Sequence, residues 1–196
     1  MPPKDRPLLL VDVDGVVSLF GFDFADPPLG FPVTVDGIPH WLSDGAGPRL
    51  RRLSRTFECV WCTGWEERAE EHLPRLLGLS GGWRHLTLGP GWKLAAIDAA
   101  IPGAQPLAWV DDAHGEAARA WASARPGPTL LMATDPAVGL TDDHVARLEA
   151  WANGNPGILG SGVGRGGSSL ATSRAYVTKS RHRVARRPSP LPYMRR

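Results

Sequence analysis

The residues of this chain best suited to chemistry are two carboxylates, Asp12 and Asp14, which follow the apolar run Leu8–Val11 and precede Gly15. A short apolar run that ends at a turn residue is typical of a buried strand in a parallel sheet. Carboxylates at the carboxyl end of such a strand lie where open α/β sheets bind their ligands. Two unit charges about 4 Å apart repel by about 4 kcal/mol at an effective dielectric of about 20. A divalent cation would offset this repulsion, so the sequence predicts a metal site here.

Further polar residues follow other predicted strands or open a predicted helix. They are Thr63 with Gly64, Lys93, and Asp111 with Asp112. Right-handed crossovers bring the carboxyl ends of parallel strands to one edge of the sheet. We therefore expect one crevice to contain four carboxylates, one hydroxyl group and one ammonium group.

The elements that position these residues are strand-like runs alternating with helix-like segments, a pattern that indicates a parallel sheet. The expected strands are Leu8–Val11, Phe57–Cys62, Trp83–Leu88, Pro106–Val110 and Thr129–Ala133. The expected helices are Pro48–Thr56, Glu66–Leu77, Lys93–Ala100, Glu116–Ala124 and a last helix capped by Thr141. The predicted fold class is α/β, a three-layer Rossmann-like domain over residues 1–152 with helices on both faces of the sheet.

Residues 20–41 interrupt this alternation and are rich in Phe, Pro and Gly. Within them, the segment VTVDGIP predicts a hairpin that turns at Asp36 and Gly37. An insertion of this size is more typical of a flap than of a domain. We expect a flap, or at most a minimal cap, beside the first strand.

The charge of the chain is divided unevenly. Residues 1–152 contain 13 Lys and Arg against 20 Asp and Glu, a net charge of −7, whereas residues 153–196 contain nine Lys and Arg and no acid. All eight Trp and all five Phe precede residue 153. Residues 153–196 are therefore predicted to be a disordered basic tail. The tail could bind nucleic acid, fold back on the acidic part of the chain, or act as a solubilising extension.

The two cysteines, Cys59 and Cys62, lie three residues apart in an expected strand. Residues at that spacing point to opposite faces, which suits neither a disulfide nor a shared metal. We expect two small buried side chains. The first apolar run is too short for a secretory signal or a membrane span, so a cytoplasmic protein with no membrane partner is expected.

The ordered polar residues resemble the motifs of the haloacid dehalogenase (HAD) superfamily of phosphatases. Asp12 and Asp14 match its D-x-D-G motif, Thr63 its strand-ending Thr or Ser, Lys93 its helix-start lysine, and Asp111 with Asp112 its acidic pair. The resemblance covers about residues 7–152. More narrowly, WCTGWEERA and the pair in AWVDD resemble the small HAD domains of bacterial RNA-repair proteins and their stand-alone relatives.

This resemblance implies a Mg²⁺-dependent phosphatase that hydrolyses a phosphomonoester through an aspartyl-phosphate, with nucleic-acid ends and nucleotides among the candidate substrates. It makes Asp12 the nucleophile and Asp14 the general acid and base. Mg²⁺ would be held by Asp12, the backbone carbonyl of Asp14, and Asp111 with or without Asp112. Lys93 would neutralise charge on the nucleophile and the phosphoryl group.

The resemblance also places Thr63 against a phosphoryl oxygen, and Gly64 and Trp65 are further substrate-binding candidates. Trp65 could stack on a nucleobase, although a Trp in this position is more often at the edge of the core. The alternative function is a non-catalytic HAD-fold module that binds nucleic acid through the basic tail. The intact acidic set favours the enzyme, because binding alone has no need of repelling carboxylates.

Overall fold

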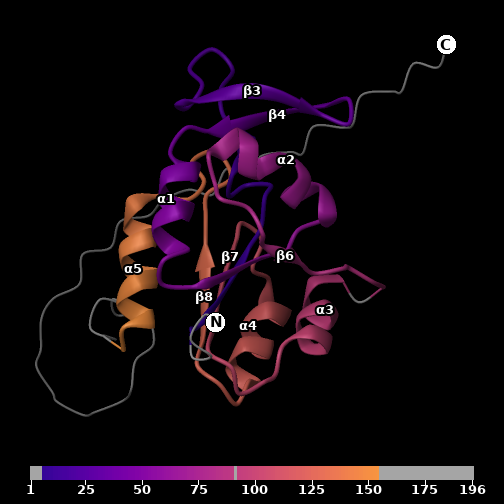
Figure 1. Cartoon of the computed structure of the whole chain (residues 1–196), viewed down its shortest axis with the longest axis vertical. Coiled ribbons are helices and arrows are strands. Elements are labelled where there is room, and N and C mark those ends of the chain that lie inside the picture. Colours follow the sequence, from indigo (N-terminus) through magenta and orange to yellow (C-terminus); the bar gives the residue numbers. More distant parts are fainter. Residues whose placement is uncertain (1–5, 91, 155–196) are drawn as a thin grey trace, which may run out of the picture. The chain divides into compact units, whose positions relative to one another are not determined.

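The computed structural model describes residues 6–90 and 92–154 and has an α/β fold built on a five-stranded parallel sheet (Figure 1). The strands of this sheet are β1 (Leu8–Val11), β5 (Glu58–Trp61), β6 (Arg84–His85), β7 (Leu107–Asp111) and β8 (Thr129–Ala133), in the order β6-β5-β1-β7-β8. The chain adds strands on one side of β1 and then crosses to the other side with β7. The carboxyl ends of β1 and β7 therefore form the topological switch point, where open α/β sheets bind ligands.

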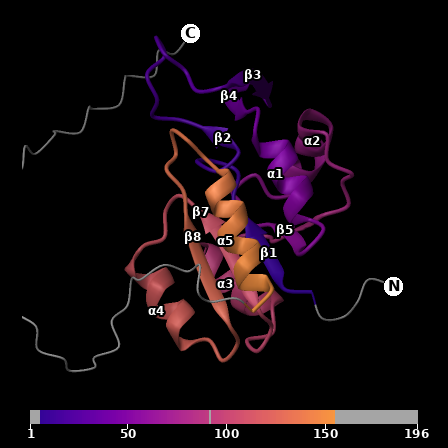
Figure 2. The same ribbon diagram turned by 90° about the vertical axis from the view of Figure 1, so that its left-hand side faces the viewer.

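Helices cover both faces of the sheet, as Figures 1 and 2 show from two directions. One face contacts α1 (Ala46–Leu53), α2 (Glu67–Leu77) and α5 (Asp142–Ala152), and the other contacts α3 (Trp92–Ala100) and α4 (Glu116–Ala124). The side chains of β1 alternate between the two faces: Leu9 and Val11 join the first cluster, and Leu8 and Leu10 the second. All four are at most 1% exposed, which explains why this strand is an uninterrupted apolar run.

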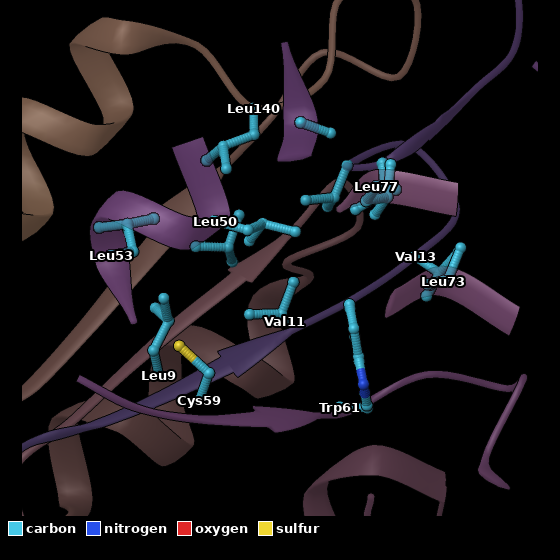
Figure 3. Packing of buried hydrophobic residues seen from close by; sticks show 14 of the residues in the cluster. Leu9, Val11, Val13, Leu50, Leu53, Cys59, Trp61, Leu73, Leu77 and Leu140 are labelled. Atoms are coloured by element: carbon cyan, nitrogen blue, oxygen red, sulfur yellow. The ribbon is translucent and has the colours of Figure 1, made fainter. Parts of the chain in front are cut away.

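The first of these clusters fixes the position of β1 against the helices. Figure 3 shows Leu9 and Val11 beside Leu50 and Leu53 of α1, with Leu73 of α2 on the same face of the sheet. Burying a side chain of this kind contributes about 1.5–3 kcal/mol. The strand that precedes Asp12 is therefore anchored to α1 and α2 through Leu9 and Val11.

A second, antiparallel sheet forms the flap. Its strands β2 (Ser18–Leu19), β3 (Gly30–Val35) and β4 (Ile38–Ser43) pair in the order β2-β4-β3. The predicted hairpin is present and turns at Asp36 and Gly37, both with positive φ (51° and 80°), as a type I′ turn requires. Strand β2 was not expected from the sequence because two residues carry no periodic signal.

Several predicted boundaries differ from the observed ones. Helix α1 begins at Ala46 and includes Pro48, because a residue in the first turn has no intrahelical acceptor for the N–H that proline lacks. Strand β6 contains only Arg84–His85, which pair with Val60 and Trp61 of β5. The predicted cap of α5 is confirmed, because the Thr141 hydroxyl accepts a hydrogen bond from the backbone N–H of His144.

The cysteines are buried, unpaired and on opposite faces of the sheet, as expected: Cys59 packs in the cluster under α1 and Cys62 in the cluster under α3. Burial raises the pKa of each thiol to about 12, so neither is a reactive thiolate. None of the helices within residues 6–90 and 92–154 is long and apolar enough to cross a membrane. The predicted basic tail lies outside the described residues, apart from residues 153 and 154.

Candidate functional site

Three of the predicted residues form a buried ionic group at the switch point of the sheet. Asp12 directly follows β1, Asp111 ends β7, and Lys93 is the second residue of α3. The Lys93 Nζ donates to Asp12 Oδ2 at 2.6 Å and to Asp111 Oδ2 at 2.7 Å. The exposed fractions of the three residues are 5%, 2% and 9% for Asp12, Asp111 and Lys93. One largely buried ammonium group thus bridges two largely buried carboxylates.

Burial and the neighbouring charges shift the pKa values of Asp12 and Lys93 in opposite directions. Burial raises the pKa of Asp12 to about 6, despite the neighbouring Lys93 charge. Burial alone would lower the pKa of Lys93, but the charges of Asp12 and Asp111 outweigh it and hold that pKa above its usual value. Lys93 therefore stays protonated, and the site carries an excess of negative charge once both carboxyls are ionised.

Neighbouring donors fix the orientation of both carboxylates. The backbone N–H of Val13 donates to Asp12 Oδ1 at 2.8 Å, and that of Ala113 donates to Asp111 Oδ1 at 2.9 Å. The indole N–H of Trp109 donates to Asp111 Oδ2 at 3.1 Å. Because every carboxylate oxygen has a donor, the two side chains are preorganised rather than free to rotate.

Asp112 completes a group of three carboxylates that could hold a metal ion. One oxygen each from Asp12, Asp111 and Asp112 lies within 4.8 Å of the others. Gly15 permits this approach, because a Cβ there would lie 2.6 Å from Asp112 Cγ, and its φ is +72°. Carboxylate oxygens are hard ligands, so the donor set fits Mg²⁺ or a similar oxygen-binding cation.

Asp14 does not belong to this carboxylate group, and its side chain is directed to the flap instead. The indole N–H of Trp65 donates to Asp14 Oδ2 at 3.2 Å and lies 3.4 Å from Oδ1. His40 of β4 lies 4.0 Å from Asp14 Oδ1, with its Nδ1 3.1 Å from the Ser18 hydroxyl. Asp14 is 53% exposed, so its carboxylate is held in place but remains open to a ligand.

The predicted residues after β5 lie at the same edge. Thr63 is 1% exposed, and its Oγ1 accepts from the backbone N–H of Trp65 at 3.3 Å. Trp65 is itself 7% exposed, and its ring packs against His40 with 4.5 Å between centroids. Most of the Trp65 surface is therefore already in contact with protein, whereas Gly64 is exposed and borders the cleft.

A cleft of about 400 Å³ separates the sheet edge from the flap. Asp12, Asp14, Gly64, Trp65 and Lys93 border it from the sheet side. Thr63, Asp111 and Asp112 do not border it, although Asp111 is hydrogen-bonded to Lys93, which does. In Figure 1 the hairpin of β3 and β4 lies beyond the carboxyl ends of the strands, where it can form the opposite wall.

Four polar or aromatic residues of this cleft were not predicted from the sequence to belong to the site. They are Asp36, His40, Arg68 and Trp92. Asp36 and His40 come from the flap, and nothing in their local sequence indicates that the flap contacts the site. Arg68 lies in the first turn of α2, where a charged residue usually faces water. No known family model matches the chain, and no curated protein shows significant similarity to it.

Proposed function

We propose that the protein is a Mg²⁺-dependent phosphatase of the HAD type that hydrolyses a phosphomonoester through an aspartyl-phosphate. The observation that carries this proposal is the bridge from Lys93 to Asp12 and Asp111 at the switch point, beside the separately held carboxylate of Asp14. Two carboxyl groups in different environments are suited to different roles in one reaction.

Asp12 is the nucleophile. One of its carboxylate oxygens attacks phosphorus, and the bond from phosphorus to the ester oxygen breaks in the same displacement. Lys93 donates to Asp12 at 2.6 Å and borders the cleft, so its charge also faces the incoming phosphoryl group. The Thr63 hydroxyl accepts from the backbone N–H of Trp65. Its role is to donate its hydrogen to a phosphoryl oxygen, which requires the phosphoryl group to enter beyond the cleft as it stands, because Thr63 is 1% exposed and does not border that cleft.

Asp14 is the general acid and base. In its protonated form it gives its proton to the departing ester oxygen, and as a carboxylate it then accepts a proton from the water that attacks the aspartyl-phosphate. This second displacement releases inorganic phosphate and restores Asp12. The indole N–H of Trp65 holds the Asp14 carboxylate at the cleft. His40, which lies 4.0 Å from Asp14, is largely neutral near pH 7 because burial lowers the pKa of His40.

The cation completes the charge balance. Asp12, Asp111 and Asp112 would hold Mg²⁺. The resemblance to the HAD superfamily adds the Asp14 backbone carbonyl as a further ligand. The bound cation supplies positive charge that neutralises the phosphoryl oxygens. The hairpin of β3 and β4 acts as a minimal cap, and the open cleft it leaves admits an extended substrate such as a nucleic-acid end.

The test is a phosphatase screen with and without Mg²⁺. Substrates are p-nitrophenyl phosphate, small phosphoesters, and oligonucleotides phosphorylated at the 3′ or 5′ end. We expect turnover that requires Mg²⁺ and is lost in Asp12→Asn but kept in Asp26→Asn, which makes the same change at an exposed loop residue. Acid quenching during turnover should trap labelled phosphate on the wild-type chain. Absence of turnover across the screen would favour the non-catalytic alternative.

A further inference from the structure

The first residue of α3, Trp92, combines two features that packing does not explain. Its φ is +55°, a region that bulky residues rarely adopt and that clusters at functional sites. Its side chain is 58% exposed, so the strained backbone does not serve to bury the indole in the core. Strain that is kept without a gain in burial indicates a role at the surface of the site.

The position of Trp92 indicates what that role is. Its indole edge lies over Gly64, where a Cβ would approach Cη2 to 3.3 Å. Trp92 therefore lies against Gly64, in the segment that follows β5, and it directly precedes Lys93 in the chain. It borders the cleft that contains Asp12 and Asp14, and also a second hollow of about 240 Å³ beside Trp109. The indole is thus accessible from within the proposed active site.

The wall of the cleft opposite the sheet combines apolar and charged side chains. Val35 and Ile38 of the hairpin line it, and Ile38 is 55% exposed. Arg68 supplies a cation at the same wall, although Asp36 lies 3.4 Å from it and balances its charge. The cleft volume is within the range of small-molecule sites, and exceeds what a phosphoryl group alone requires.

We infer that Trp92 is a stacking platform for a planar aromatic ring in the leaving group of the substrate. The substrate class is then a phosphoester with an aromatic ring, either a nucleotide or an aryl phosphate, rather than a phosphorylated sugar or polyol. The assignment of the ring to the leaving group rests on the proposed function, but the stacking site itself does not. Trp92 is the exposed ring, whereas Trp65 is buried and occupied with Asp14.

Binding can be tested apart from turnover in the full chain carrying Asp12→Asn, with Mg²⁺ present. Calorimetric titration compares AMP and phenyl phosphate with ribose 5-phosphate and inorganic phosphate. AMP and phenyl phosphate are expected to bind at least about tenfold more tightly than ribose 5-phosphate, the size of effect that one stacked ring produces. If only one of the two aromatic ligands shows this preference, it identifies the source of the ring.

The role of Trp92 is tested by the same titrations in chains that carry a Trp92 substitution in addition to Asp12→Asn. Trp92→Ala should weaken the binding of AMP by about tenfold and remove the preference for AMP over ribose 5-phosphate. Trp92→Phe should keep most of this preference, because it retains an aromatic ring. The control, Phe24→Ala, removes an aromatic ring that is 86% exposed and lies outside this cleft, and should leave AMP binding unchanged. Thermal melting verifies that each variant is folded.

Three results overturn the inference: equal affinities for AMP and ribose 5-phosphate, no binding of either, or an aromatic preference that survives in Trp92→Ala. Ring-dependent binding without turnover of any phosphoester by the wild type would leave the stacking site intact and reject the phosphatase. Turnover that is indifferent to the ring would reject the stacking site and leave the phosphatase intact.

Discussion

Replacing Asp12 by Asn is expected to stabilise the metal-free protein while abolishing turnover. The Asp12 carboxyl is buried beside Lys93 and Asp111, and burial raises its pKa from 3.8 to about 6. A carboxyl pKa that is higher in the folded state favours the protonated form there, so ionisation of Asp12 destabilises the fold. Asn has nearly the same shape and no charge, and it removes this cost.

The size of the gain follows from the two pKa values. Their difference corresponds to about 3 kcal/mol of destabilisation at pH 7, where Asp12 is ionised in both folded and unfolded chains. A chain of this length changes its Tm by roughly 2–4 °C per kcal/mol, so Asp12→Asn should raise the Tm by roughly 6–12 °C. The gain should shrink as the pH falls through about 6 and disappear below about 4, where the carboxyl is protonated in both states.

The assay is thermal melting from pH 4 to pH 8 in EDTA, with wild type, Asp12→Asn and the exposed-loop control Asp26→Asn. The control should follow the wild type at every pH. Turnover of the Asp12→Asn variant should fall at least about 10⁴-fold, about 5 kcal/mol of barrier, as expected for loss of a covalent nucleophile. A lower Tm for Asp12→Asn at pH 7, or the same gain at pH 4 as at pH 7, would refute the reasoning from burial.

Three further outcomes are expected. Mg²⁺ at about 100 times its dissociation constant should add about 2.7 kcal/mol to the free energy of unfolding, and the double variant Asp111→Ala/Asp112→Ala should lose this thermal shift; equal shifts would contradict the metal assignment. Gly15→Ala should lower the Tm more than Gly21→Ala, because both residues have positive φ but only a Cβ at Gly15 meets the Asp112 side chain, at 2.6 Å; equal losses would show that this contact yields. Removing residues 153–196 should leave turnover of a small phosphoester unchanged and should weaken binding of phosphorylated oligonucleotides at low salt, measured by fluorescence anisotropy; loss of small-substrate turnover would place the tail in the catalytic unit.

The parallel sheet and the residues at its edge could be predicted from the sequence because both depend on local patterns. Leu8–Val11 is apolar throughout because β1 is buried on both faces, and that pattern needs no knowledge of its neighbours. Asp12 and Asp111 follow apolar strands, and parallel topology alone brings such strand ends to one edge. The hairpin turn was predictable for the same reason, since Asp36 and Gly37 suit a type I′ turn wherever the hairpin lies.

The contacts among these residues were decided by the tertiary structure. The sequence suggested four carboxylates with one hydroxyl and one ammonium group in one crevice. Packing brings three of the carboxylates within 4.8 Å of one another, with Lys93 bridging Asp12 and Asp111, and directs the fourth, Asp14, to Trp65 instead. These distances depend on where α3 and the flap pack against the sheet, which the local sequence of neither segment encodes. The backbone strain at Trp92 likewise arises from the path of the chain into α3. Side-chain type determines what chemistry a residue can do, whereas long-range packing determines its partners and therefore its role.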